Sequence, residues 1–274
     1  MKRIILSIIV FVFLLFIIAA HAQFTDKEIV EREKIEALLK TADITKAEEI
    51  GEGITKPWRL YLKKGEEELS GCWKNPQGVQ KGHLEGWQYE IAAYRMDKLL
   101  GLNMIPPTVE REFEGKKGSL QLWAESDFSL LDVMERGIPF PNKNPEATIF
   151  KRGKYIARAF DSLIANDDRT QQNARYTKNW RLILIDHSRS FRSKKKYCKK
   201  LLYGKNGLKE KKLFRQLPHS FVEKIKALEY DNVKNTVGSY LTDEEINAVL
   251  VRKKLLLAEI EEMITEMGQD KVLY

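Results

Sequence analysis

Three polar residues in the segment 160–191 have the residue types and the order that phosphoryl transfer needs. Asp168 and Asn173 lie five positions apart, and Asp186 directly follows the apolar run 182–185. In that chemistry one carboxylate positions the attacking hydroxyl, while an Asn and a second Asp hold the magnesium ions that bridge the phosphates. The segment therefore predicts a catalytic loop that is followed by a metal-binding carboxylate.

Each of these residues also has an ordinary structural explanation. Asp and Asn are common in turns, and an Asp and an Asn at this spacing are by themselves a weak motif. The flanking residues strengthen the chemical interpretation, because residues 155–165 have the apolar periodicity of a helix and residues 181–185 form a short, mostly apolar run typical of a strand. This order of helix, loop, strand and carboxylate favours a reaction centre over a set of unrelated turn residues.

A lysine and a glutamate upstream form a second candidate pair. Residues 67–74 predict a strand that ends in Lys74, and Glu90 lies in the first turn of the predicted helix 88–100, which Gly101 ends. Most lysines are solvated surface residues. A strand lysine held by a glutamate on the next helix, however, is the arrangement that orients nucleotide phosphates. We therefore predict that the two side chains pair.

Two further strands, 47–55 and 57–63, are predicted before Lys74. Gly51 and Gly53 interrupt the first strand, which an ordinary β-bulge would explain. Glycine also lets the backbone approach an anion closely, and the strand that carries the lysine follows shortly afterwards. We therefore predict a phosphate-covering turn at these two glycines.

Together these segments resemble a known superfamily. Residues 90–109, followed by FDSLIANDDRTQQN at 160–173 and LIDHSRSF at 184–191, resemble the atypical branch of the protein-kinase-like superfamily. That branch includes phosphoinositide kinases, actin-fragmin kinase, HipA-type kinases and secretory-pathway kinases. The resemblance implies an α+β fold with two lobes: a small antiparallel β-rich lobe over about 46–125 and a mainly helical lobe over about 126–274, with ATP bound between them.

The resemblance also implies roles for the candidate residues. Lys74 would bind the α- and β-phosphates, and Glu90 would hold Lys74 in place. Asp168 would act as the catalytic base, and Asn173 and Asp186 would bind Mg²⁺. A phosphotransferase of this kind therefore implies ATP and Mg²⁺ as cofactors.

Residues 119–125 resemble the strand that leads to the hinge of such a fold. Leu122, Trp123 and Glu125 are accordingly expected at the adenine edge, beside the phosphate contacts of the two glycines. The chain departs from the family in three ways: Thr170 replaces a frequent His, Asp-His-Ser at 186–188 replaces Asp-Phe-Gly, and the glycine turn is short. His187 is expected to pack as a structural residue where Phe usually does.

The two cysteines, Cys72 and Cys198, would be able to pair in an oxidising compartment. Alternation along the strand puts Cys72 on the same face as Lys74. In a kinase-like lobe this face lines the nucleotide site, where a disulfide would block the pocket. We therefore expect both cysteines to be free thiols.

The N-terminus predicts export. Lys2 and Arg3 precede an apolar run of 17 residues, 4–20, and Ala20-His21-Ala22 supplies a small-x-small cleavage pattern. A cleaved signal at 1–22 and an uncleaved anchor both fit this length, and both place the domain outside the cytoplasm. Residues 23–45 are expected to form a helical extension, and 46–274 the kinase-like domain.

The net charge of +8 is unevenly distributed. Residues 192–215 contain eleven Lys or Arg and one acid, so that the remainder of the chain is slightly acidic. Such runs are commonly solvated loops. This run follows the expected metal-binding Asp, so it would attract an acidic protein, a phosphorylated head group or an anionic membrane surface. Nucleic acid is not expected, because no recognition motif accompanies the charge.

The last third predicts a helical scaffold. Residues 218–228 form one amphipathic segment, and Thr242 and Glu245 form a capping box that opens a helix to about residue 267. The whole chain, with 43% hydrophobic and 31% charged residues, is long enough for one two-lobed domain.

These patterns predict an ATP- and magnesium-dependent phosphotransferase that acts, outside the cytoplasm, on a hydroxyl of a protein or lipid-like acceptor. Two alternatives use the same residues. A nucleotide-binding pseudoenzyme would regulate or scaffold a partner, and a nucleotidyltransferase would bind the nucleotide in the opposite direction.

Overall fold

The computed structural model describes residues 24–51, 56–80, 82–209 and 215–274. The expected export segment 1–22, Gly53 and part of the basic run lie outside the described residues. The described chain begins with two short helices, α1 (Asp26–Val30) and α2 (Arg32–Thr41), and Thr25 caps the first of them in a capping box with Glu28. A helical N-terminal extension was expected here.

A five-stranded antiparallel sheet follows, in the order β1-β2-β3-β7-β6. Its strands are β1 (Asp43–Glu49), β2 (Trp58–Lys64), β3 (Glu67–Lys74), β6 (Thr108–Phe113) and β7 (Lys116–Leu122). The strand β3 has the predicted bounds. The first strand begins at Asp43 instead of residue 47 and ends before Gly51, because it pairs with β2 along its whole length.

A small hairpin, β4 (Gln77–Gln80) and β5 (His83–Gly86), connects the sheet to helix α3 (Trp87–Leu100). This hairpin was not predicted. Helix α3 ends at Gly101, whose φ of 65° is left-handed and therefore suits glycine, as predicted.

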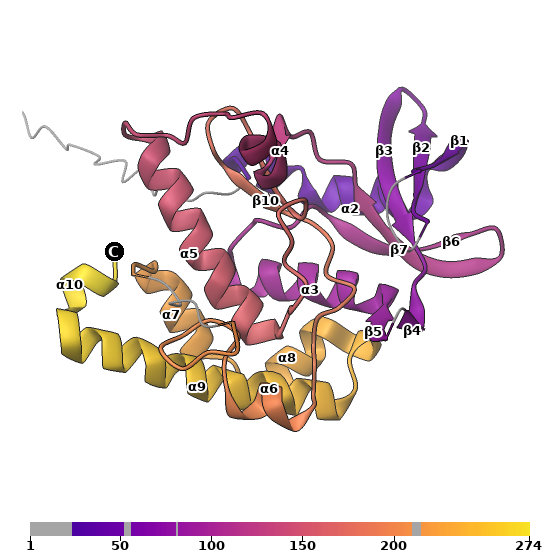
Figure 1. Ribbon diagram of the computed structural model, residues 1–274. Helices are drawn as coiled ribbons and strands as arrows, with labels where there is room; N and C mark the ends of the chain where they lie inside the picture. The colour runs from indigo at the N-terminus through magenta and orange to yellow at the C-terminus, as the bar shows by residue number, and fades with distance from the viewer. Residues whose placement is uncertain (1–23, 52–55, 81, 210–214) are drawn as a thin grey trace, which may run out of the picture.

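The two faces of the large sheet are covered by different helices. Leu60 and Leu62 of β2 point to the face on which Leu39 of α2 packs, and Trp73 and Leu120 complete this smaller core. Helix α3 contacts β6 and β7, and Figure 1 shows α3 lying between the sheet and the helices of the C-terminal half.

The C-terminal half is mainly helical. It contains α4 (Leu130–Glu135), α5 (Glu146–Ile164), α6 (Lys195–Lys199), α7 (His219–Lys226), α8 (Tyr230–Val237), the 3-10 helix η1 (Gly238–Tyr240), α9 (Asp243–Met267) and α10 (Gln269–Val272). A small sheet in the order β10-β9-β8 adds β8 (Phe128–Ser129), β9 (Ala174–Tyr176) and β10 (Leu182–Leu184).

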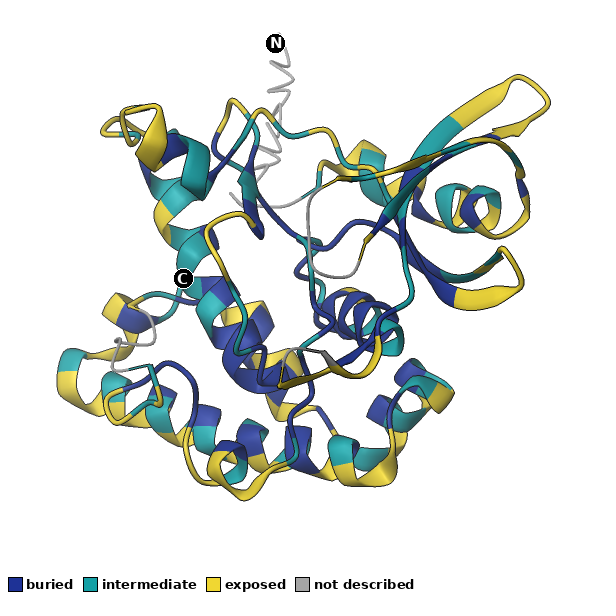
Figure 2. Cartoon of the chain, turned by 45° about the vertical axis from the view of Figure 1, so that its right-hand side comes forward, coloured by how far each residue is buried: buried dark blue, intermediate teal, exposed yellow. Residues whose placement is uncertain are grey.

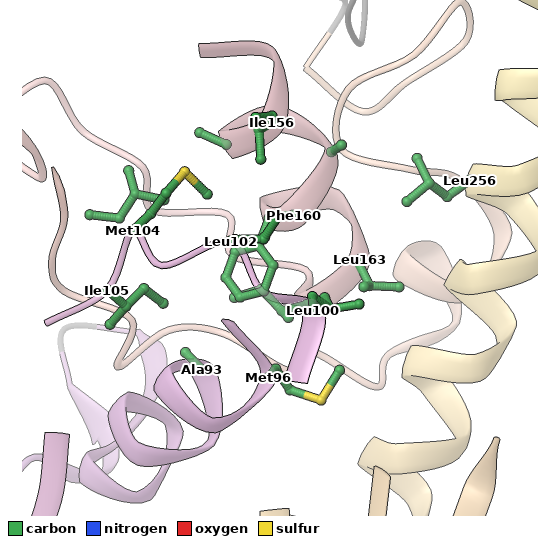
Figure 3. Packing of buried hydrophobic residues seen from close by; sticks show 14 of the residues in the cluster. Ala93, Met96, Leu100, Leu102, Met104, Ile105, Ile156, Phe160, Leu163 and Leu256 are labelled. Carbon is green, nitrogen blue, oxygen red and sulfur yellow. The ribbon is translucent and has the colours of Figure 1, made fainter. Parts of the chain in front are cut away.

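The main core joins α3 to this half. Met96 and Leu100 of α3 belong to the same buried cluster as Phe160 and Leu163 of α5 and Leu256 of α9, and Figure 3 shows these side chains converging. Figure 2 shows the buried residues on the inward sides of the helices and the exposed residues on their outward sides. This amphipathic burial is the packing that the periodicity of the long helices predicts.

Several predicted boundaries shift. Helix α5 begins at Glu146, earlier than residue 155, and it ends at Ile164. The C-cap residue Ala165, whose φ of 51° is left-handed, stops the helix just before the loop of Asp168. The capping box of Thr242 and Glu245 opens α9 as predicted. The basic run holds the short helix α6 rather than loop alone. Within the described ranges, no helix has the length and apolar composition of a membrane span.

Candidate functional site

The predicted lysine and glutamate contact each other. Lys74 is the last residue of β3, and its Nζ lies 2.9 Å from Oε1 of Glu90 on α3 and 3.0 Å from Oδ1 of Asp186. Burial by itself lowers the pKa of Lys74, but the carboxylates of Asp186 and Glu90 outweigh burial and raise this pKa well above its ordinary value. The ammonium group is therefore charged and shared by two carboxylates.

Glu90 also holds the segment that follows Asp186. Its side chain is 2% exposed, and Oε2 accepts a hydrogen bond of 2.8 Å from the backbone N–H of His187. Burial raises the pKa of Glu90, but Lys74 and His187 overcome this effect, so that the pKa is lowered. Breaking such a buried pair leaves an uncompensated charge, which makes Glu90 a structural as well as an electrostatic link.

His187 fills a buried position beside the site. It is 0% exposed, and burial and then the neighbouring charge of Arg169 lower the pKa of its imidazole. The neutral ring accepts a hydrogen bond at Nε2 from Nη2 of Arg169, 2.8 Å away. This setting fits the structural role expected for a residue that replaces Phe.

Arg169 ties the loop of Asp168 to its surroundings. Its guanidinium makes two hydrogen bonds, of 3.0 and 3.1 Å, to the buried carboxylate of Asp161 on α5. Nη1 donates to the backbone carbonyls of Asn173 (3.0 Å) and Ile185 (2.7 Å). One side chain with five donors thus joins helix α5, the loop and the strand that leads to Asp186.

Asn173 directly precedes β9, and Asp186 follows the end of β10, the strand that pairs with β9. The backbone N–H of Ile185 donates to the carbonyl of Asn173 over 3.2 Å, which brings the two predicted metal ligands to neighbouring positions. Asp186 has a φ of 60°, an uncommon value for a residue with a side chain, and Ser188 Oγ donates to its Oδ1 over 3.3 Å.

Asp168 lies at the more open end of the site. Its side chain is 33% exposed, and burial, with the charge of Asp186, raises its pKa although Arg189 opposes this rise. The backbone N–H of Asp168 donates to Oδ1 of Asn166 over 3.2 Å, and its carbonyl accepts from Nδ2 of Asn173 over 3.2 Å. The predicted base therefore has a fixed backbone and an accessible carboxylate.

Two of these residues have the chemistry of magnesium ligands. The Asn173 amide nitrogen is used by the Asp168 carbonyl, so the amide oxygen is the atom that remains for a cation. The carboxylate of Asp186 is 36% exposed. Both offer hard oxygen ligands, as Mg²⁺ prefers. In the part of the chain that the structure describes, no group of three or more His, Cys, Asp and Glu side chains forms a cage for a metal.

The residues expected at the adenine edge are partly used within the protein. The backbone N–H of Leu122 donates to Pro107, and that of Trp123 donates to Ser70, each over 2.8 Å. A nucleotide held here would therefore use groups other than these two N–H donors. Glu125 follows the end of β7 without a regular element of its own.

Gly51 lies at an exposed bend, and a Cβ at this position would meet nothing within 4 Å. The described structure therefore gives no steric reason for glycine there. Cys72 and Cys198 are free thiols, as expected. Burial raises the pKa of the Cys72 thiol to about 11, so it is protonated beside Lys74.

Four charged residues of the site were not predicted: Arg169, Asp161, Arg189 and Glu85. Arg169 lies one position after Asp168, and Arg189 lies three positions after Asp186. Their closeness in sequence to predicted site residues was therefore a signal that they belong to the site. Asp161 and Glu85 carried no such signal, because only the packing of α5 and of the hairpin β4-β5 brings them close.

Two cavities lie away from these residues. A cavity of about 490 Å³ lies between α2, α3, β6 and the end of α8, and another of about 650 Å³ lies between α5 and α9. Their polar side chains are largely paired with one another: Glu36, for example, binds Tyr94 and Lys98.

No family model and no curated protein matches this chain. A solved structure of hydra Fam20 with sugar is similar, with a TM-score of 0.63 and 18% sequence identity, over 93% of this chain and 95% of that chain. At this identity the likeness concerns the fold. The chain therefore shares with the hydra protein a mixed fold in which an antiparallel β-sheet is joined to a larger set of helices.

Proposed function

We propose that this protein is an ATP- and magnesium-dependent phosphotransferase of the protein-kinase-like superfamily. The observation that carries the proposal is the contact of Lys74 with both Glu90 and Asp186 at 2.9 and 3.0 Å. A strand lysine, a helix glutamate and a metal-binding Asp meet in this way where nucleotide phosphates are oriented. The fold of hydra Fam20 supports a kinase-like chain at the level of architecture.

In this proposal the two parts of the chain are two lobes, about 46–125 and about 126–274, with the nucleotide between them. Lys74 would neutralise the phosphates, Glu90 would keep Lys74 extended, and Asn173 and Asp186 would hold Mg²⁺. The metal would supply charge neutralisation of the transferring group. Asp168 orients the acceptor hydroxyl and takes its proton, a role that fits its accessible carboxylate and raised pKa.

The phosphate and adenine contacts complete the nucleotide site in this proposal. Gly51 and Gly53 would cover the phosphates, and Leu122, Trp123 and Glu125 would border the adenine. Because two N–H donors of this segment are already used, adenine would meet carbonyl groups or side chains here.

The acceptor is a hydroxyl on an anionic or surface-bound molecule. The exposed side chains of α6 and its flanks, Lys194, Lys195, Lys196, Lys199 and Lys200, have no carboxylate within 4 Å among the described residues. This lysine surface adjoins the loop of Asp168, because Tyr197 hydrogen-bonds to Asp167. An acidic protein, a phosphorylated head group or an anionic membrane surface fits its charge.

The sugar in the hydra structure adds a sugar hydroxyl to the acceptors worth testing. The basic residues before the apolar run 4–20 place the domain outside the cytoplasm in this proposal, with 1–22 as signal or anchor.

One observation favours a regulatory, nucleotide-binding function as the second candidate. The carboxylate of Asp168 is 3.2 Å from the guanidinium of Arg189, so the predicted base is already engaged by a cation. In a pseudoenzyme this contact would keep the carboxylate from taking the proton of an acceptor.

The test is incubation of the protein from residue 23 onward with γ-labelled or α-labelled ATP and Mg²⁺. Acidic proteins, anionic vesicles and sugars serve as acceptors. Transfer of the γ-label supports the phosphotransferase, and transfer of the α-label identifies a nucleotidyltransferase. Saturable ATP binding without transfer of either label identifies the pseudoenzyme.

A further inference from the structure

A chain of three charged residues connects the hairpin β4-β5 to the predicted catalytic base. Oε1 of Glu85, on β5, lies 2.7 Å from Nη2 of Arg189 and accepts a hydrogen bond of 2.8 Å from its Nε. The remaining Nη1 of Arg189 lies 3.2 Å from Oδ2 of Asp168. The guanidinium therefore binds one carboxylate along one edge and reaches the other with its third nitrogen.

Exposure rises along this chain. The side chain of Glu85 is 2% exposed, that of Arg189 13%, and that of Asp168 33%. The buried end is thus fixed by the protein, and the open end faces the space where an acceptor would bind. Because a guanidinium is planar and its donors have fixed directions, an arginine anchored at one edge also fixes the group at its other edge.

The hairpin that carries Glu85 is anchored to the same segment as Arg189. The N–H of Gly86 donates to the carbonyl of Ser188 over 3.0 Å. Nη1 of Arg192 donates to the carbonyl of Leu84 over 2.6 Å. The hairpin also lies in the chain between Lys74 and Glu90, the two residues that pair at the lysine end of the site.

We propose that Arg189 is a positioning residue for Asp168, and that Glu85 is the buried anchor that holds Arg189. This inference rests on the proposed function, because it assigns a use to the orientation of the Asp168 carboxylate. The hairpin β4-β5 then becomes a part of the reaction centre through Glu85.

The first test measures the loop itself and needs no acceptor. In the Glu85→Gln variant, Arg189 loses its charged anchor while Asp168 is unaltered. We expect amide hydrogen exchange at Asp168 and Thr170 to become about threefold faster or more, because the loop opens more often. Arg111→Gln is the matched control, since the guanidinium of Arg111 binds two backbone carbonyls at the far side of the sheet. Unchanged exchange in Glu85→Gln would overturn the inference.

The second test is a double-mutant cycle on phosphate transfer. Arg189→Gln should reduce kcat by about 10- to 100-fold, because a positioned acid–base group supplies about 10²- to 10⁴-fold and only its positioning is lost. The KM for Mg-ATP should stay within about twofold of the wild-type value. In the Asp168→Asn background the same substitution should cause no further loss, because its effect acts through that carboxylate. Arg189→Lys should recover part of the activity.

An equal loss in both backgrounds would show that Arg189 acts independently of Asp168 and would overturn the inference. The two proposals fail differently. If Glu85→Gln shows faster loop exchange but the wild-type protein transfers no label, the positioning contact is supported and the phosphotransferase is rejected. If the wild-type protein transfers the γ-label, but Glu85→Gln matches it in exchange and Arg189→Gln matches it in turnover, only the positioning role of Arg189 is rejected.

Discussion

The two ends of the proposed cleft are built in different ways. At the lysine end, Glu90 and His187 are 2% and 0% exposed, and each carboxylate oxygen of Glu90 has a partner within 3 Å. At the other end, Asp168 is 33% exposed, and the side chain that binds its carboxylate is the partly buried Arg189. The lysine end is therefore completed by folding, whereas the Asp168 end stays open to an acceptor.

This contrast predicts different failures for two aspartates. Asp168→Asn should reduce turnover by about 10²- to 10⁴-fold and leave Mg-ATP affinity almost unchanged, because the base contacts the acceptor. Asp186→Asn should also weaken magnesium-dependent ATP binding, because an amide oxygen is a poorer ligand than a carboxylate. Calorimetric titration with and without Mg²⁺, beside a turnover assay, separates the two. The reverse pattern, with ATP binding lost only in Asp168→Asn, would contradict the assignment of roles.

The buried end should dominate stability. Glu90→Ala leaves Lys74 with one carboxylate fewer and removes the acceptor of the His187 N–H, so we expect a loss of about 3–5 kcal/mol in the free energy of unfolding. Urea denaturation measures it. Glu67→Ala is the control, because it breaks the exposed pair with Lys34 and should have little effect. Equal losses of unfolding free energy in Glu90→Ala and Glu67→Ala would show that burial does not make the first pair contribute more to stability than the second.

The lysine end should also control nucleotide binding. At Mg-ATP concentrations about 100 times Kd, binding should stabilise the wild-type protein by about 2.7 kcal/mol. Lys74→Ala should lose most of this gain, measured as the ligand-induced rise in Tm. Lys64→Ala, on the exposed end of the neighbouring strand β2, should keep it. A full ligand-induced rise in Lys74→Ala would remove Lys74 from the site.

The smallest expected effect lies beyond the open end, on the lysine surface of α6. Each substitution of an exposed lysine there by glutamine should weaken binding to anionic vesicles or acidic peptides by roughly fivefold, and added salt should weaken binding further. Lys195→Gln and Lys199→Gln are the variants to compare in a sedimentation or anisotropy assay. Affinities independent of both salt and substitution would assign the acceptor contact to another surface.

Much of the local structure was predictable because the signals are local. The strand β3, the stop of α3 at Gly101, and the capping box of Thr242 each depend on residues close in sequence. The hairpin β4-β5 was not predicted, because its strands are only four residues long and two of its side chains, Val79 and Leu84, are exposed. With their apolar side chains exposed, such strands lack the apolar–polar alternation that identifies a half-buried strand.

The sequence by itself determined which groups are available for chemistry. The order of lysine, glutamate and three loop residues, with the helices and strands around them, was sufficient to propose phosphoryl transfer, since each element carries its own periodicity and stop signal. The contact between Lys74 and Glu90 was predicted from a lysine that ends a strand and a glutamate that opens the next helix, and it is present. The roles of Asp168, Asn173 and Asp186 remain predictions that the experiments above address.

Only the tertiary structure decided how these groups are held. Lys74 and Asp186 lie 112 residues apart in the chain, and Glu85 and Arg189 lie 104 apart. No local pattern specifies such contacts, because they depend on how α3, the hairpin and the strand before Asp186 pack together. Burial then sets the strength of each ion pair. The same kinds of charges are closely held around Glu90 and accessible around Asp168. This difference arises only because the folded chain excludes water from one end of the site and not from the other.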